Sequence, residues 1–375
     1  MIETYDIKKI EKLLEGITKK VRIIEYEVTP NFPFSRDMQG GRWLTTEHCD
    51  WSGGHWVGLL LNAYRWSGDN YFLDEAKKKL NAVKMRVNDD DEFLGFIFRY
   101  SYAHLADMLK SDEYKATAIQ AADRLLEMYN GKIGLIPLGS QCRIVGTNIK
   151  GSNLAGVDDA IIPNTLLFWA SEKTSDKKYR QVAIENLDRI VDLFMRPDGS
   201  TIHMIKFDPE NGDIIDKWNN LGYDPTTTWS RGQAFFLLAL AYGFNATHYQ
   251  KYQELYSRSF SFFLKSTHGK DLTPYYDLAD PNIPKVPLDT SSLSIIAESY
   301  LLMLKNGYGD YTMLERIVES LITHMDAETD SSVILKDGCF DYPRKVAINS
   351  ELIFSDYYCF DFLFELANYM KGEKS

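Results

Sequence analysis

Residues 223 to 263 read YDPTTTWSRGQAFFLLALAYGFNATHYQKYQELYSRSFSFF, and the architecture of the chain can be inferred from this one segment. Its middle part, QAFFLLALAYGF, is apolar on every side, which is typical of a helix that is buried all round. After the short turn NATHY comes a helix whose apolar residues fall on one side, as expected when one face is exposed to water. The segment therefore predicts a hairpin of one inner and one outer helix.

The same hairpin recurs along the chain. Four other segments repeat this order, and they begin at HWVGLLLNAYRW, GFIFRYSYAHLADML, NTLLFWASEK and SSLSIIAESYLLML. A charged helix from about Ile7 to Ile23 precedes the first hairpin, and an apolar helix, DYYCFDFLFELANYM, follows the last one. The sequence thus predicts an all-α protein, an (α/α)6 barrel of six inner and six outer helices that forms a single domain over residues 1–375.

The connections between hairpins are much longer than the turns within them. The long connections lie near residues 24–54, 130–160, 196–230, 268–290 and 326–352, and they are rich in Gly, Pro, Trp, Tyr and Asp. In a barrel of alternating helices they all emerge at one end, around the N-termini of the inner helices, and long ordered loops are usually functional. Because helix N-termini favour anions, we expect a pocket for a small acidic ligand at this end.

Composition and charge argue against several classes of partner. The chain has 53 acidic and 42 basic residues, a net charge of -11 and no block of Lys and Arg, which disfavours nucleic acid and anionic membranes. No apolar run approaches a membrane span, and the N-terminal stretch lacks the apolar core of a signal peptide. The four cysteines stand far apart, which disfavours a zinc site or a disulfide framework. We expect a cytoplasmic protein with no metal and no cofactor.

An aromatic ring, a cationic side chain and an amide side chain lie close together in sequence at the start of the inner helix within residues 223–263. Trp229, Arg231 and Gln233 follow three threonines that can cap a helix. The combination suits a sugar acid, because the ring can stack on a pyranose face, the guanidinium can pair with a carboxylate and the amide can bond hydroxyls. An ordinary buried helix start is the alternative interpretation of the same residues.

Six segments carry a resemblance to a known family. They are DWSGGHW at 50–56, VDDAIIPNTLLFWASEKTSDKKYR at 157–180, HMIKFDPENGD at 203–213, TTTWSRGQAF at 226–235, LDTSSLSIIA at 288–297 and SDYYCFDFL at 355–363. The chain resembles glycoside hydrolase family 88, the unsaturated glucuronyl hydrolases, over nearly its whole length. The resemblance implies an (α/α)6 barrel that removes a 4,5-unsaturated uronic acid from the non-reducing end of small oligosaccharides made by polysaccharide lyases. It also implies a reaction without a metal, in which the enol-ether double bond is hydrated and the resulting hemiketal falls apart.

The match places the family's catalytic aspartate on Asp159. Hydration of an enol ether needs a proton at one alkene carbon and water at the other, so a carboxyl group with a pKa near neutrality can act as acid and then as base. Asp158 supplies a like charge, which raises one pKa of the pair if both side chains face the pocket. From the residues alone, the two aspartates could instead cap the next helix. The resemblance favours catalysis by Asp159.

The second carboxylate of the family is missing from its expected position. The family has a His-Asp pair just before a Gly-aromatic at the second inner helix, but here the segment reads DDDEFLGFIF and the aspartate falls on Phe93. Asp91 and Glu92 stand beside it, and either could reach the same space. A family glutamine is replaced by Leu221 and a family tryptophan by Phe235. Phe93 and Phe235 are therefore predicted to line an altered substrate pocket.

The remaining family positions are retained in this chain. The resemblance implies that Trp51 and Trp229 form stacking walls, that His203 bonds hydroxyls or orients water, and that Arg231 supports the substrate carboxylate. For each of them, core packing or an internal ion pair is the alternative. The predicted function is a hydrolase for small unsaturated uronic-acid oligosaccharides. The alternatives are an unsaturated rhamnogalacturonyl hydrolase and a relative that binds sugar acids without catalysis.

Overall fold

The protein is an (α/α)6 barrel, as the sequence predicts. The structure, a computed structural model, describes residues 6–38, 41–143, 150–267, 269, 271–326 and 331–372. Within these residues, six inner helical segments alternate along the chain with six outer helices. The inner segments are α2 (Gly53–Ser67), α4 (Leu94–Phe98) continued by a π-helical turn (Arg99–Ala103) and α5 (His104–Leu109), α7 (Ile162–Thr174), α9 (Ser230–Thr247), α11 (Thr290–Lys305) and α13 (Ile353–Lys371).

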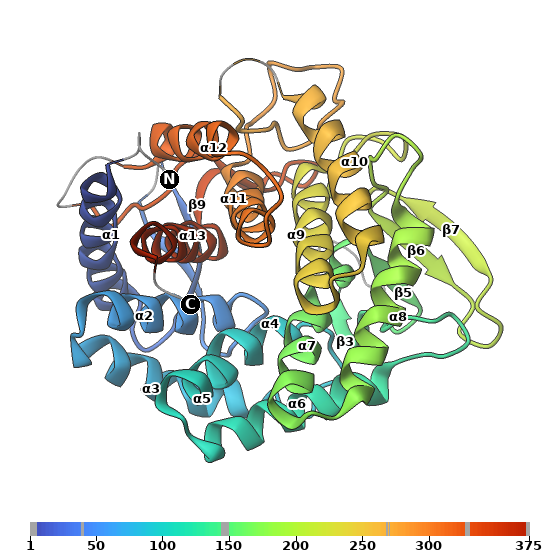
Figure 1. Cartoon of the computed structure of the whole chain (residues 1–375), viewed down its shortest axis with the longest axis horizontal. Coiled ribbons are helices and arrows are strands. Elements are labelled where there is room, and N and C mark those ends of the chain that lie inside the picture. Colours follow the sequence, from blue (N-terminus) through green and yellow to red (C-terminus); the bar gives the residue numbers. More distant parts are fainter. Residues whose placement is uncertain are drawn as a thin grey trace.

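The outer helices form the periphery of the molecule in Figure 1. They are α1 (Ile7–Val28), α3 (Asn70–Lys84), α6 (Asp112–Met128), α8 (Lys177–Phe194), α10 (Gln250–Ser266) and α12 (Tyr311–His324). The inner helix α9 is buried on every face, whereas α8 buries a single stripe of Tyr179, Ala183, Asn186, Leu187, Ile190 and Phe194. This difference in burial confirms the inner and outer assignment made from the apolar pattern.

Short turns with a repeated cap join each inner helix to the next outer one. The inner helices α2, α5, α7 and α9 end in a residue with left-handed backbone conformation. Except for α10, each outer helix in the described chain then begins at an Asp or Ser whose side chain accepts a hydrogen bond from the first turn. The capping residues are Asp6, Asp69, Ser111, Asp176 and Asp310. Four of these capping residues, Asp69, Ser111, Asp176 and Asp310, lie in the short turns between an inner and an outer helix.

The long connections contain β-structure that the sequence analysis did not anticipate. One sheet has the order β2-β1-β9-β8, another the order β5-β6-β7, and β3 pairs with β4, all antiparallel. The strands are β1 (Phe32–Asp37), β2 (Trp43–Thr46), β3 (Gly139–Arg143), β4 (Lys150–Gly151), β5 (Leu154–Gly156), β6 (Met204–Phe207), β7 (Ile214–Trp218), β8 (Gly338–Asp341) and β9 (Val346–Leu352). Because β1 and β9 are far apart in sequence, their pairing ties the first long connection to the last one.

Several helix ends differ from the sequence-based prediction. The first helix was expected to end at Ile23 but continues to Val28, because Ile24 and Val28 extend its buried stripe. The inner helix α2 begins at Gly53, two residues before the segment HWVGLLLNAYRW, and α13 begins at Ile353 instead of Asp356. None of the described helices combines the length and the apolar character needed to cross a bilayer.

A glycine sets the closest contact between two inner helices. Gly95 in α4 packs against the backbone of α7, and a Cβ atom built on it would overlap the carbonyl oxygen of Ile162. Any larger residue would therefore push the two helices apart. Glu92 lies just before α4, and Asp159 lies in a short 3₁₀ turn (Asp158–Ala160) just before α7, so this contact fixes the distance between two acidic side chains.

We predict that Gly95→Ala destabilises the protein by about 1–3 kcal/mol, because the added methyl group forces the helices apart. Urea denaturation measures the change in the free energy of unfolding. Gly16→Ala is the matched control, because a Cβ atom at Gly16 in α1 meets nothing within 4 Å. It should stabilise the helix by about 0.5–1 kcal/mol. A Gly95→Ala variant as stable as the wild type would contradict the proposed close packing.

Candidate active site

A cavity of 130 Å³ lies at the N-terminal ends of the inner helices. Its aromatic walls are Trp51, Phe93, Phe96, Trp229, Phe235 and Phe340, and its polar side chains are Glu92, Asp158, Asp159, His203, Asn220 and Arg231. The remaining lining residues are Leu138, Cys142, Gly156, Ile162, Met204 and Leu221. Four of the five long connections contribute to this lining, as expected. The volume is below that of a typical drug-sized pocket, which suits one small ring more than a chain segment.

Two buried carboxyl groups, those of Glu92 and Asp159, face each other in this cavity. Each residue is 1% exposed. The Oδ2 atom of Asp159 accepts a hydrogen bond from the backbone N–H of Gly156 at 2.7 Å. Burial raises the pKa of both carboxyl groups well above their ordinary values. The negative charge of Asp159 and a hydrogen bond between the two side chains raise the pKa of Glu92 further.

Contact between these carboxyl groups raises the pKa of Glu92 and lowers that of Asp159. The Oε2 atom of Glu92 is buried, and no donor among the described residues reaches it. Two ionised carboxylates could not approach each other in such a site, whereas a protonated Glu92 can donate to Asp159. The hydrogen bond with Glu92 in turn lowers the pKa of Asp159, against the effect of burial. Contact between the two side chains thus favours a proton on Glu92 over one on Asp159.

The short segment before α7 is built around a second glycine. A Cβ atom on Gly156 would lie 2.5 Å from Oδ1 of Asp158 and 3.2 Å from Oδ1 of Asp159, so only glycine leaves both carboxyl groups in place. Asn186 of α8 donates its amide to the carbonyl oxygen of Asp159 at 2.9 Å. Burial raises the pKa of Asp158 to about 6, although the charge of Arg231 opposes the shift. Asp158 thus adds a third titratable group to the cavity.

A neutral histidine stacks on a tryptophan across the cavity. The rings of His203 and Trp229 lie 4.4 Å apart at 26°. The Nδ1 atom of His203 accepts hydrogen bonds from the backbone N–H groups of Asn220 at 3.3 Å and Leu221 at 3.2 Å. Burial, helped by the charge of Arg231, lowers the pKa of His203 to about 3, so the ring is neutral. With Nδ1 as acceptor, Nε2 carries the proton and can act as a donor.

Aromatic rings enclose the cavity on the side of the first long connection. Trp51 lies 5.4 Å from Phe93, 6.2 Å from Phe340 in a stacked arrangement, and 4.9 Å from Phe354. Phe93, which stands where an aspartate was expected, thus becomes part of an apolar wall. Phe235 packs 5.7 Å from Phe96 and forms part of the cavity floor.

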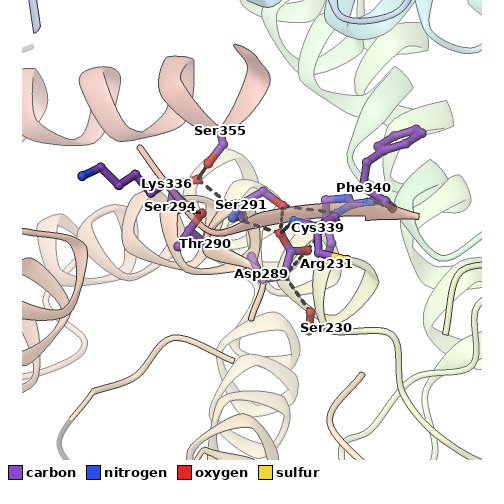
Figure 2. Close-up of polar contacts among 11 residues, drawn as sticks. Ser230, Arg231, Asp289, Thr290, Ser291, Ser294, Lys336, Cys339, Phe340 and Ser355 are labelled. Carbon is purple, nitrogen blue, oxygen red and sulfur yellow. Dashed lines mark hydrogen bonds and ion pairs between the residues drawn. The ribbon is translucent and has the colours of Figure 1, made fainter. Parts of the chain in front are cut away.

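Arg231 borders the cavity, but its guanidinium group is engaged in internal bonds (Figure 2). Its Nη1 atom donates to Asp289 at 2.8 Å, to Ser291 at 3.2 Å and to the carbonyl oxygen of Cys339 at 2.8 Å. The Nη2 atom donates to the carbonyl oxygen of Phe340 at 2.6 Å. The long connection near 268–290, which does not line the cavity, supplies Asp289. Arg231 therefore ties the starts of α9 and α11 to β8.

The same guanidinium group lies against two aromatic walls. It stands 4.6 Å from the ring of Trp229 and 5.4 Å from that of Phe340. Arg231 is 1% exposed, and its partner Asp289 is fully buried. A buried pair of this kind is costly to break, because either partner alone would leave an uncompensated charge. These contacts correspond to the internal ion pair that the sequence analysis kept as the alternative interpretation of Arg231.

Two of the predicted site residues lie outside the cavity lining. Gln233 is fully buried, and its amide bonds Thr201 at 3.0 Å, Gly199 at 2.9 Å and the hydroxyl of Ser259 at 2.6 Å. It therefore anchors a connection to α10. Asp91 pairs with Arg86 at 2.6 Å and is turned away from the cavity. Between the two candidates for the missing carboxylate, Glu92 is the one that lines the site.

Several lining residues were not identified from the sequence. Phe340 and Gly156 belong to strands β8 and β5, and only the folding of these connections brings them to the cavity. The sequence did contain a clue to Gly156, because this glycine lies just two residues before the paired carboxylates of Asp158 and Asp159. Within the described ranges, no three or more His, Cys, Asp or Glu side chains form a group that could hold a metal ion.

Comparison with known proteins identifies relatives of similar length. The chain is 27% identical over 300 residues to the unsaturated chondroitin disaccharide hydrolase of Streptococcus pyogenes serotype M1, covering 79% of this chain and 73% of the relative. It is 25% identical over 368 residues to the unsaturated glucuronyl hydrolase of Formosa agariphila, covering 95% of this chain and 89% of the relative. No protein-family profile matches the chain.

Among solved structures, the chain is similar to the unsaturated glucuronyl hydrolase of Bacillus sp. GL1. The TM-score is 0.85, with 23% sequence identity, over 96% of this chain and 97% of that chain. At this level of identity the structural similarity establishes the fold, in agreement with the barrel inferred from the helical hairpins.

Proposed function

Because the chain belongs to the unsaturated glucuronyl hydrolases, we propose that it removes a 4,5-unsaturated uronic acid from the non-reducing end of small oligosaccharides left by polysaccharide lyases. The observation that supports catalysis most strongly is the buried pair of Glu92 and Asp159 at the cavity. A site that only bound sugar acids would gain nothing from two carboxyl groups sharing a proton. The small volume agrees with removal of one terminal sugar ring.

The pair can supply the proton chemistry of enol-ether hydration. The proton that Glu92 and Asp159 share passes through Asp159 to one alkene carbon, which leaves both carboxyl groups ionised only while the substrate carries the compensating positive charge of an oxocarbenium ion. Water then attacks the other alkene carbon, and the ionised pair takes up the proton that this water loses. One water molecule has been added across the double bond, and the pair has regained its proton. The hemiketal so formed opens to a keto acid and a shortened sugar.

The other lining residues hold the sugar and the water. Trp51 and Trp229 offer faces on which a sugar ring can stack, and Phe93 and Phe235 fill the space beside it. The Nε2–H group of His203 can donate to a sugar hydroxyl or orient the attacking water. Arg231 supports the aromatic walls, because its Nη1 and Nη2 atoms donate to Asp289, Cys339 and Phe340. We propose this supporting role in place of the direct contact with the substrate carboxylate that the resemblance implies.

We further propose that the whole barrel acts as one catalytic domain in the cytoplasm. All four cysteines are free and buried, which is common in a reducing compartment. An unsaturated rhamnogalacturonyl disaccharide is the alternative substrate, because Leu221 and Phe235 change the polar character of the pocket from that of the family. The same cavity would accommodate either substrate by stacking.

A substrate panel tests the proposed function. The purified protein is incubated with unsaturated disaccharides made by lyases from chondroitin, heparin, gellan, alginate and rhamnogalacturonan, and the ultraviolet absorbance of the conjugated alkene carboxylate is followed. Hydration removes the conjugation, so we expect the absorbance to fall with at least one substrate. The substrate that reacts fastest identifies the uronide class. Unchanged absorbance across the whole panel would refute the enzyme and leave the binding-only relative.

Single substitutions of Asp159 and Glu92 test the proposed catalytic pair, and Asp91, the neighbour of Glu92 in the sequence, provides the matched control. We predict that Asp159→Asn lowers kcat by about a thousandfold and that Glu92→Gln lowers it by about a hundredfold or more, because each removes one member of the proton-sharing pair. Asp91→Asn is the control, since Asp91 lies outside the cavity and pairs with Arg86. It should retain kcat near the wild-type value, with a lower free energy of unfolding. Full activity in Glu92→Gln would refute the role of the second carboxyl group.

A further inference from the structure

A second and larger cavity opens at the other end of the barrel. It has a volume of 1170 Å³, and all six inner helical segments contribute to its lining. Representative lining residues are Arg65 of α2, Arg99 of the π-helical turn, Trp169 of α7, Tyr242 of α9, Glu298 of α11 and Asp361 of α13. Most residues of the full lining lie toward the C-terminal ends of their helices, whereas the candidate active site lies at the N-terminal ends. The proposed reaction uses none of these residues.

An aromatic layer separates the two cavities. Phe96 and Phe235 line the candidate active site, whereas Tyr100 and Tyr357 line the larger cavity. The rings of Phe96 and Tyr100 stack at 5.4 Å, and those of Tyr100 and Tyr357 lie 4.6 Å apart. Because the lining sets share no residue, a ligand in the larger cavity would be distinct from the substrate in the candidate active site.

Most charged side chains around the larger cavity neutralise one another. Lys173 pairs with Asp107 at 2.9 Å. Glu365 pairs with Lys305 at 2.7 Å and with Arg65 at 3.4 Å. These ion pairs form a rim around the cavity, and their charges are neutralised within the protein without a ligand.

Arg99 and Glu298 are among the charged lining residues that form no ion pair within the described residues. Within the described chain, no hydrogen bond, ion pair or ring contact is found for the guanidinium group of Arg99. The Oε1 atom of Glu298 accepts a hydrogen bond from Tyr242 at 3.3 Å, but its Oε2 atom is buried without a partner. The cavity is therefore lined by a half-buried guanidinium group and by one buried carboxylate oxygen, Oε2 of Glu298, neither of which has a hydrogen-bond partner in the described chain. Buried polar groups of this kind are normally satisfied, by protein, water or a ligand.

The walls between these two groups are partly aromatic. Phe168, Trp169 and Tyr242 line the cavity, and the indole N–H of Trp169 is fixed by a hydrogen bond to Asp107 at 2.9 Å. A guanidinium group recognises a carboxylate, a free acceptor recognises a hydroxyl, and aromatic faces recognise the C–H face of a sugar ring. A ligand that satisfies all three carries an acidic group and several hydroxyls on one ring.

We propose that the larger cavity is a second binding site, for a monosaccharide acid, with its carboxylate on Arg99 and its hydroxyls toward Glu298. This site is independent of the proposed catalytic reaction. The protein's net charge of -11 would otherwise repel such an anion, so binding depends on the local guanidinium group. The volume of 1170 Å³ is ample for a single ring together with bound water.

Fluorine NMR of the full chain labelled with fluorotryptophan tests the proposal, because each cavity has its own reporters. Trp169 lines the larger cavity, whereas Trp51 and Trp229 line the candidate active site. Single Trp→Phe variants assign the three signals. On titration with D-glucuronate, we expect a saturable shift of the Trp169 signal. D-glucose, which lacks the carboxylate, should bind at least about tenfold more weakly.

Variants identify the groups responsible. Arg99→Gln should weaken the Trp169 response to D-glucuronate by about tenfold or more, since it removes a charge-assisted contact. Lys178→Gln is the control, because it removes the same charge from an exposed position at the start of α8 without touching the cavity. It should leave the response unchanged.

The wild-type titration alone can refute the site, whether or not the Arg99 variant folds. A Trp169 signal that does not shift with D-glucuronate would show a cavity filled with water only, and one that shifts equally with D-glucose would show that the cavity does not recognise the carboxylate. A shift confined to Trp51 and Trp229 would assign binding to the candidate active site. Either result would overturn the second site without bearing on the hydrolase activity.

Discussion

The contact between α4 and α7 at Gly95 is the constraint on which the candidate site depends. It brings the segments that precede the two helices so close that Glu92 and Asp159 meet in a buried cavity. Burial alone would make each carboxyl group neutral, but their mutual contact allows one proton to serve both. The packing of α4 against α7 thus sets how many protons the carboxyl groups of Glu92 and Asp159 hold. That number decides whether the pair can act as an acid and then as a base.

A second layer of contacts makes the cavity rigid. Arg231 joins the start of α9, the cap of α11 and strand β8, while also lying against the rings of Trp229 and Phe340. The aromatic walls are therefore held by a buried ion pair that lies behind them. Trp229 offers a face to the substrate and Arg231 supports that face from behind, although the two residues are neighbours within one helical turn of the sequence.

Much of the fold could be predicted because inner and outer helices differ in a property visible in sequence, the number of apolar faces. The strands in the connections could not be predicted, since their pairing joins segments as distant as β1 and β9.

The candidate site was predicted in part. Asp159, His203 and the tryptophans lie on the cavity as expected, but adjacent residues such as Asp91 and Glu92 cannot be told apart until a fold turns one of them inward. Gln233 and Arg231 carry suitable chemical groups, yet their partners Ser259 and Asp289 are not evident from the local sequence.

The central claim, that Glu92 replaces the missing aspartate by sharing a proton with Asp159, can be measured directly. Carbon NMR of protein labelled at glutamate side-chain carboxyl groups follows the titration of Glu92, whose signal is assigned by its loss in Glu92→Gln. We expect Glu92 to remain protonated at neutral pH in the wild type. Its pKa should fall in Asp159→Asn, because the charge and hydrogen bond that raise it are changed. A Glu92 that is ionised at neutral pH, with the same pKa in both proteins, would contradict the account.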